Sequence, residues 1–220
     1  MANRRRRRRR RRAETRKKMI IGTMALMAAL GGVLWLTSGS QSQSVAGKEN
    51  KNVAQPTWID EQLIQTNGSA RRGKKLEEVK NIVIHYVANP GTTAKQNRDY
   101  FNNLQNTHLT KASSHYIVGL DGEGIQCIPQ SEISYASNNR NKDTISIECC
   151  HPKKNGKFND KTYNSAVRLT AWICKTYGLS SQNVIRHYDV TGKMCPRYYV
   201  KHEQAWKDFC NKVQECLEKD

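Results

Sequence analysis

The chain has 220 residues, with 37 Lys and Arg against 19 Asp and Glu, and carries a net charge of +18 at pH 7. This length leaves room for one domain of common size plus extensions, and it excludes a chain of several full domains. The charge is uneven, because residues 1–18 contain nine consecutive arginines and hold +11, which leaves +7 for the remainder. We interpret residues 1–18 as a basic arm.

Residues 19–37 form an uncharged, mostly apolar stretch that is long enough for a transmembrane helix. We therefore expect a single-pass membrane anchor, with the basic arm in the cytoplasm, where it contacts anionic lipids, and the rest of the chain outside. Runs of arginine also occur in arms that bind nucleic acids. Here a membrane-length segment separates the run from the folded part, so no nucleic acid partner is expected.

A cleaved signal peptide is the alternative, since it also combines a charged start with an apolar core. Ser44-Val45-Ala46 is a possible cleavage site, and the product would then be secreted. The apolar core is longer than that of most signal peptides, which favours an uncleaved anchor and a location at the cell membrane. Residues 38–55 are mostly Ser, Gln, Asn, Lys and Gly, so we predict a flexible linker there.

Residues 56–220 have the pattern of a single α/β domain. Apolar runs rich in β-branched residues predict strands at residues 81–87, 114–118, 125–129, 144–150 and 183–185. Apolar residues at helical spacing predict helices at residues 93–107, at residues 161–177 and around Trp206, Phe209, Val213 and Leu217. Strands and helices alternate, and residues 119–124 indicate an antiparallel hairpin. We therefore expect a mixed central sheet with helices on its faces.

The predicted strand at residues 144–150 places a carboxyl group inside the domain. Side chains alternate along a strand, so Ile145 and Ile147 share one face while Ser146 and Glu148 share the other. A buried Glu without a partner is costly, so its presence indicates a functional site. An exposed edge position is the alternative.

Three side chains form a candidate metal site. His187 follows the apolar run of residues 183–185, and Cys195 comes eight residues later, after a polar segment that we predict to be a loop. Two ligands are too few for catalytic zinc, which takes three protein ligands and an open position for water. His85 also lies near the end of an apolar strand, and we therefore predict Zn²⁺ held by His85, His187 and Cys195.

Four segments carry a resemblance to a known family: Ile82 to Tyr86, Ser113 to Val118, Ile145 to Glu148, and His187 to Pro196. In this order they resemble the zinc-dependent N-acetylmuramoyl-L-alanine amidases, the family related to phage T7 lysozyme and to peptidoglycan recognition proteins. The resemblance implies a hydrolase that cuts peptidoglycan between N-acetylmuramic acid and L-alanine. We expect the chain to act as a monomer. It implies Glu148 as general base and Lys193, two residues before a ligand, as oxyanion donor.

A module that binds muropeptides without cutting them is the alternative function. Relatives that lose activity typically lose the Cys ligand, and this chain keeps Cys195, which favours catalysis. The chain departs from the family at Tyr135-Ala136-Ser137-Asn138, where relatives usually carry Trp-His-Ala-Gly, so a His that could contact substrate is missing. His115 lies in a Ser-His-Tyr segment, and its role is either structural or a substrate contact.

Two further expectations concern side chains around the proposed ligands and the thiols. Asp189 and Arg186 flank His187, and we predict that they hydrogen-bond the ligands from outside. The chain has seven cysteines. Several lie on predicted apolar faces, so we expect mainly buried free thiols and at most one disulfide.

Overall fold

The structure is a computed structural model that describes residues 53–219. The predicted basic arm (residues 1–18), the predicted anchor (residues 19–37) and most of the predicted linker lie outside the described residues. Within residues 53–219, no helix has both the length and the apolar composition needed to cross a membrane.

Six strands form one sheet, and they are β1 (Ile59–Glu61), β2 (Asn81–Tyr86), β3 (Tyr116–Val118), β4 (Gly124–Gln126), β5 (Thr144–Cys149) and β6 (Val184–Arg186). Their order across the sheet is β1-β4-β3-β5-β2-β6. The hairpin pair β3 and β4 is antiparallel, and every other neighbouring pair is parallel. The predicted mixed sheet is therefore confirmed.

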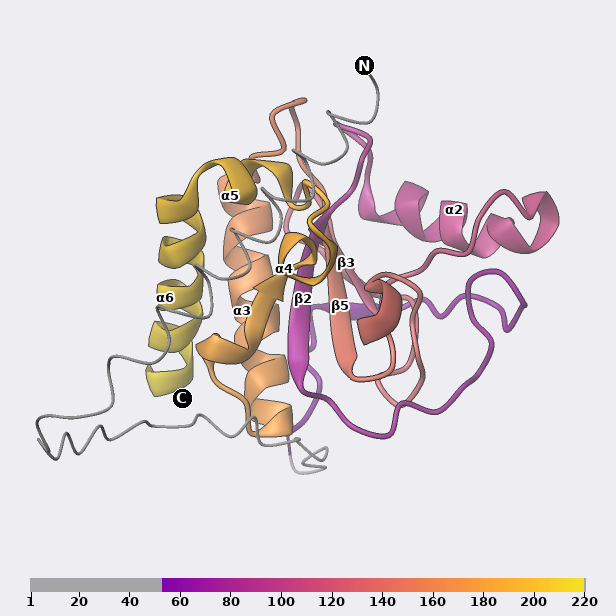
Figure 1. The fold of residues 1–220 in the computed structure, drawn as a ribbon, viewed down its shortest axis with the longest axis horizontal. Helices are drawn as coiled ribbons and strands as arrows, with labels where there is room; N and C mark the ends of the chain where they lie inside the picture. Colours follow the sequence, from indigo (N-terminus) through magenta and orange to yellow (C-terminus); the bar gives the residue numbers. More distant parts are fainter. Residues whose placement is uncertain (1–52, 220) are drawn as a thin grey trace, which may run out of the picture. The chain divides into compact units, whose positions relative to one another are not determined.

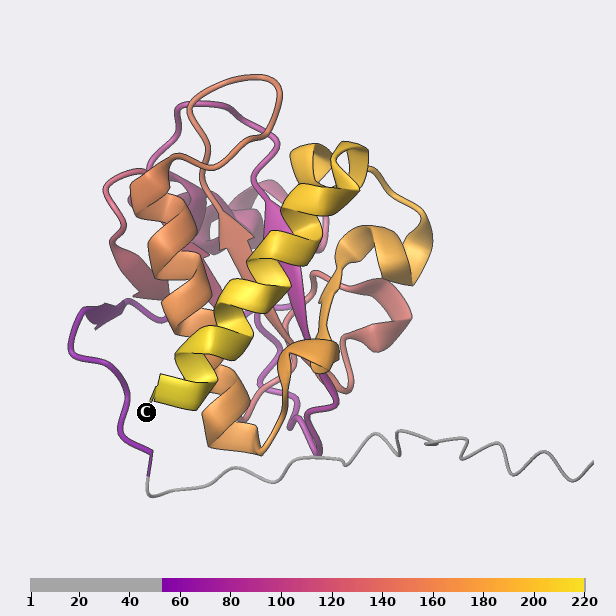
Figure 2. The ribbon, with the colours of Figure 1, turned by 90° about the vertical axis from the view of Figure 1, so that its left-hand side faces the viewer.

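The main helices are α2 (Ala94–Thr107), α3 (Asp160–Tyr177) and α6 (Glu203–Lys219), with the short helices α4 (His187–Thr191) and α5 (Arg197–Lys201) and the 3₁₀ turns η1 (Asn138–Arg140) and η2 (Ser181–Asn183). Helices α3 and α6 lie side by side on one face of the sheet (Figures 1 and 2), and α2 packs against β3 and β4 from the other side. The expected arrangement of helices on both faces is confirmed.

The alternation predicted for β5 separates an apolar core from a polar face. Ile145, Ile147 and Cys149 are buried in the core under α3 and α6. Cys150 belongs to the smaller core under α2, with Phe101. Ser146 and Glu148 therefore project to the side of the sheet on which α2 lies, and that side holds the polar clusters of the domain.

The segment from His187 to Cys195 differs from the predicted loop, because its first five residues form α4. The Asp189 side chain accepts a hydrogen bond from the Arg186 backbone N–H (2.8 Å), which caps the start of this helix. Gly192 ends it with φ +76°, a conformation that favours glycine. The chain then turns back toward the sheet.

All seven cysteines are free thiols, which agrees with the expectation of at most one disulfide. Five of them are buried. Burial raises the pKa of Cys150 and of Cys174 to about 12, so these two thiols stay protonated and poorly reactive at neutral pH.

Candidate metal centre and its pocket

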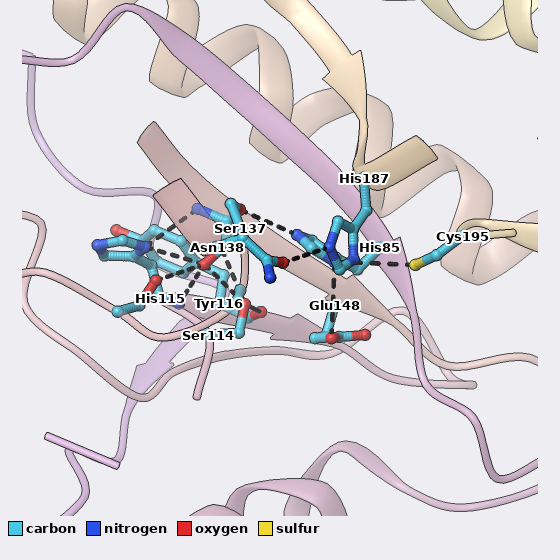
Figure 3. A network of polar contacts seen from close by, with 12 residues as sticks. His85, Ser114, His115, Tyr116, Ser137, Asn138, Glu148, His187 and Cys195 are labelled. Carbon is cyan, nitrogen blue, oxygen red and sulfur yellow. Dashed lines mark hydrogen bonds and ion pairs between the residues drawn. The ribbon is translucent and has the colours of Figure 1, made fainter. Parts of the chain in front are cut away.

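Three adjacent strands bring the predicted site residues to one edge of the sheet. β2 lies between β5 and β6 and is parallel to both. His85 on β2 is directly opposite Glu148 on β5, and side chains in register on neighbouring strands project from the same face. His187 follows β6 immediately. Because parallel strands end at the same edge, the three side chains meet there (Figure 3).

Cys195 completes the group from the segment after α4. The Tyr188 backbone N–H donates to the Cys195 carbonyl oxygen (2.8 Å), which fixes the returning chain beside the start of the helix. Cys195 Sγ lies 3.8 Å from His85 Nδ1. One ligand atom from each of His85, His187 and Cys195 lies within 4.8 Å of the others, and all three residues are buried. The structure thus brings together the three predicted ligands.

The Arg186 side chain holds α4, and with it His187, against α6. Its guanidinium donates to Asp189 (2.9 Å) and to Glu203 (2.7 Å), and it lies 5.4 Å from the centre of the Trp206 ring. We predicted that Arg186 and Asp189 would hydrogen-bond the ligands. That prediction is wrong, because these side chains bond each other and α6 and position His187 only through the backbone.

The electrostatics of the three side chains suit a metal. Burial, reinforced by electrostatic interactions with His187 and Lys193, holds the pKa of His85 well below its ordinary value, and burial and Lys193 also lower the pKa of His187. Both imidazoles are therefore neutral and offer a lone pair. Burial and the nearby Glu148 raise the pKa of the Cys195 thiol to about 12, so a thiolate there requires an adjacent cation. Two imidazoles and one thiolate fit zinc.

The carboxyl group of Glu148 lies beside the cluster of His85, His187 and Cys195. Its Oε1 is 4.0 Å from His85 Nδ1, and because His85 is neutral this contact is not an ion pair. Its buried Oε2 has no hydrogen-bond partner among the described residues. Burial, opposed by the charge of Lys193, raises the pKa of Glu148 to about 7. The carboxyl group can therefore gain and lose a proton at neutral pH.

A cavity of about 480 Å³ opens over the cluster, a volume typical of sites for small ligands. Glu148 and the three candidate ligands form part of its wall, and the exposed Lys193 also lines it. Phe101 of α2 and Lys111 of the following loop belong to the same wall. Neither residue was predicted to line the pocket, because nothing in its local sequence pattern indicates a position beside the candidate ligands.

The chain is similar to known proteins of one family. The family model described as N-acetylmuramoyl-L-alanine amidase matches residues 75–198. The chain belongs to this amidase family. Among curated proteins it is similar to the N-acetylmuramoyl-L-alanine amidase CwlL of Bacillus licheniformis, with 38% identity over 168 residues, covering 70% of this chain and 46% of CwlL. A probable N-acetylmuramoyl-L-alanine amidase of the same organism is 35% identical over 167 residues, covering 70% and 47%.

The chain thus spans about half the length of the curated relatives it matches. Among solved structures it is similar to PlyL, with a TM-score of 0.62 and 25% identity, covering 72% of this chain and 98% of that structure.

The sequence left open the roles of His115 and of the segment Tyr135 to Asn138, and the structure shows where both lie. His115 is fully buried away from the cluster: its Nδ1 accepts from the Ser146 backbone N–H (3.0 Å) and its Nε2–H donates to the Glu132 carbonyl oxygen (2.9 Å). It is structural. In the segment Tyr135 to Asn138, where the sequence departs from the family pattern, Tyr135, Ala136 and Asn138 line the pocket.

Proposed function

We propose that this chain hydrolyses the amide bond between the lactyl group of N-acetylmuramic acid and L-alanine in peptidoglycan, as a monomer, with Zn²⁺ held by His85, His187 and Cys195. Family membership supports the reaction class. The observation that carries the proposal is a buried His-His-Cys cluster beside Glu148, whose buried Oε2 has no hydrogen-bond partner in the part of the chain that the structure describes. A module that only binds muropeptides has no use for such a carboxyl group, which costs stability.

The donor set defines what the metal would contribute. Three protein ligands leave a fourth position of a tetrahedral zinc site open. A zinc ion bound there would lower the pKa of a water molecule and polarise the scissile carbonyl group.

Glu148 and Lys193 supply the remaining chemistry. With a pKa near 7, Glu148 is partly ionised at neutral pH, accepts a proton from the attacking water and then delivers it to the leaving nitrogen of L-alanine. Lys193 lines the same pocket, and its ammonium group donates a hydrogen bond to the carbonyl oxygen as negative charge develops there. The products are a free lactyl carboxylate and a free alanine amino group.

The test is digestion of purified peptidoglycan with the full-length chain, with and without a zinc chelator, alongside Glu148→Gln as a near-isosteric control. New amino-terminal alanine and new reducing sugar ends are measured separately. We expect chelator-sensitive alanine ends, no reducing ends, and neither product from Glu148→Gln. Wall binding and zinc retention without release of alanine ends would instead establish a binding module.

We further propose that residues 19–37 anchor the enzyme in the cell membrane, with residues 1–18 in the cytoplasm against anionic lipids and residues 56–220 outside, where peptidoglycan lies. The uncharged 19-residue stretch and the preceding arginines support this topology. The full-length chain should sediment with membranes, and deletion of residues 19–37 should release it. Recovery of a chain that begins near Ala46 would show a cleaved, secreted form instead.

A further inference from the structure

A loop before β5 lies against the two histidines on the side away from Cys195 (Figure 3). Ser137 Oγ is 3.3 Å from His85 Nε2, and Asn138 Oδ1 is 3.0 Å from His187 Nε2. Ser137 is almost fully buried, with 1% of its surface exposed. Two consecutive residues therefore each contact one imidazole.

The Asn138 contact decides which ring nitrogen of His187 is left for a metal, and the position of Ser137 and Cys195 indicates the same arrangement for His85. An amide oxygen can only accept a hydrogen bond, so His187 Nε2 carries the proton and His187 Nδ1 keeps its lone pair. On His85, Nδ1 lies 3.8 Å from Cys195 Sγ, while Nε2 lies on the side of Ser137. With the Ser137 hydroxyl as acceptor, both rings present Nδ1 to the cluster.

The loop holds this arrangement through its own hydrogen bonds. The Asn141 side-chain oxygen accepts from the backbone N–H groups of Ala136 (3.1 Å) and Ser137 (2.6 Å). Arg140 donates to Asp143 (2.8 Å) and to Asn81 at the start of β2 (2.6 Å). The loop is thus tied by hydrogen bonds to the strand that carries His85.

The backbone at Asn138 fits the same role. Its φ of +54° lies in the left-handed region, which Asn adopts more readily than most residues other than Gly. Asn138 therefore accommodates the turn and also provides a side-chain oxygen that reaches His187.

We propose that Ser137 and Asn138 are positioning residues of the metal centre, which accept hydrogen bonds from Nε2–H of His85 and His187 and thereby aim both Nδ1 atoms at the position shared with Cys195. The inference rests on the proposed zinc site. Partners of this kind fix the tautomer and orientation of a ligand, and their loss typically weakens metal binding by about 10- to 100-fold.

The first test measures the zinc affinity of the full-length chain by competition with a chromogenic chelator. Ser137→Ala and Asn138→Gly each remove one acceptor, and Gly tolerates the positive φ, so both variants keep the fold. We expect about tenfold weaker binding for each and about 100-fold for the double variant. Asn138→Asp keeps an acceptor oxygen and should restore binding.

Asn139→Gly is the matched control, because Asn139 is the exposed neighbour on the same turn and makes neither histidine contact. It should bind zinc as the wild type does. Wild-type affinity in Ser137→Ala and Asn138→Gly would overturn the inference. A wild-type chain that binds no zinc would overturn the proposed function itself, so the two failures are distinguishable.

The second test reads the tautomers directly in the metal-free chain from the imidazole ¹⁵N chemical shifts. We expect the Nε2–H form for His85 and His187, and a mixture of both tautomers at His187 in Asn138→Gly. An Nδ1–H tautomer at either residue in the wild type would contradict the proposed role.

Discussion

Ser146 and Glu148 lie on the same face of strand β5, two residues apart, and their surroundings differ. Around Ser146, the imidazole of His115 has a partner on both ring nitrogens, the Ser146 N–H and the Glu132 carbonyl oxygen. Around Glu148, the buried Oε2 atom has no hydrogen-bond partner within residues 53–219, and His85 Nδ1 lies 3.8 Å from the sulfur of Cys195. Both ring nitrogens in the first cluster are hydrogen-bonded to other protein groups, whereas the second cluster contains a carboxylate oxygen that is unpaired within the described part of the chain.

The difference distinguishes a structural network from the candidate functional site. Buried polar groups are normally paired, since leaving one unpaired costs free energy. The Ser146 cluster follows this rule, with the hydroxyl groups of Ser134 (2.8 Å) and Ser114 (3.2 Å) adding further bonds. The Glu148 cluster breaks it at one edge of the sheet, where a metal ion and a substrate would supply the missing partners.

The largest effect should come from removing a ligand. Cys195→Ser replaces the thiolate donor by a weaker hydroxyl, so we expect loss of bound zinc and a fall in amide hydrolysis of at least about 10³-fold, since metal activation contributes several kcal/mol. Zinc content by atomic absorption and the rate of alanine-end release measure both. If Cys195→Ser keeps a full equivalent of zinc and most of its activity, the cluster is not the metal centre.

Glu148→Gln should lower kcat by about 10²- to 10⁴-fold, the usual contribution of a general base, while zinc binding stays near wild type. The amide keeps the shape of the side chain but cannot take the proton. Steady-state kinetics on soluble muropeptides and the zinc competition assay separate the two properties. A variant that loses zinc along with activity would place Glu148 among the ligands instead.

The Ser146 cluster should affect stability rather than catalysis. Burial lowers the pKa of His115 to about 4. As pH falls from about 6.5 toward 4, the unfolded chain binds the proton first, so the native state loses about 3 kcal/mol of stability over that window. Protonation would break the bond in which His115 Nδ1 accepts from the Ser146 N–H.

Urea unfolding of the metal-free wild type and of His115→Gln at pH 7 and pH 4 isolates this contribution, because other titrating groups are common to both chains. The gap in unfolding free energy between them should narrow by about 3 kcal/mol at the lower pH. An unchanged difference in unfolding free energy, or a His115 ring signal that titrates near pH 6.5 by NMR, would show that burial does not lower the pKa of His115.

The smallest effect is expected at Lys193, which is exposed. Lys193→Met should lower kcat by about 10²-fold, or about 2.7 kcal/mol, as expected for one oxyanion donor. The fold and zinc affinity should not change. An unchanged kcat with a raised KM would assign Lys193 to substrate binding rather than to the transition state.

Much of the fold and the site could be predicted from local patterns. The β-branched run of β2 and the alternation of β5 placed His85 and Glu148 correctly at the edge of the sheet. Helical spacing placed α3 within one residue of its start and identified Trp206, Phe209 and Val213 as the buried stripe of α6. These features depend on periods of two and 3.6 residues, which are visible in the sequence.

The contacts that the sequence did not predict join residues far apart in the chain. The contact of Ser137 with His85 spans 52 residues, and that of Asn138 with His187 spans 49. No local period encodes such pairs, because they depend on the path of a loop. The helix α4 was not predicted for another reason. It has only five residues, too few to show a helical period in the sequence, and its start is stabilised by the Asp189 cap.

The most direct measurement is an anomalous difference map at the zinc absorption edge, from crystals of the protein grown with zinc. We predict one peak, at about 2.0–2.1 Å from Nδ1 of His85 and His187 and about 2.3 Å from Cys195 Sγ, and none at the Ser146 cluster. A map without a peak at these three residues, or with zinc held by other side chains, would contradict it.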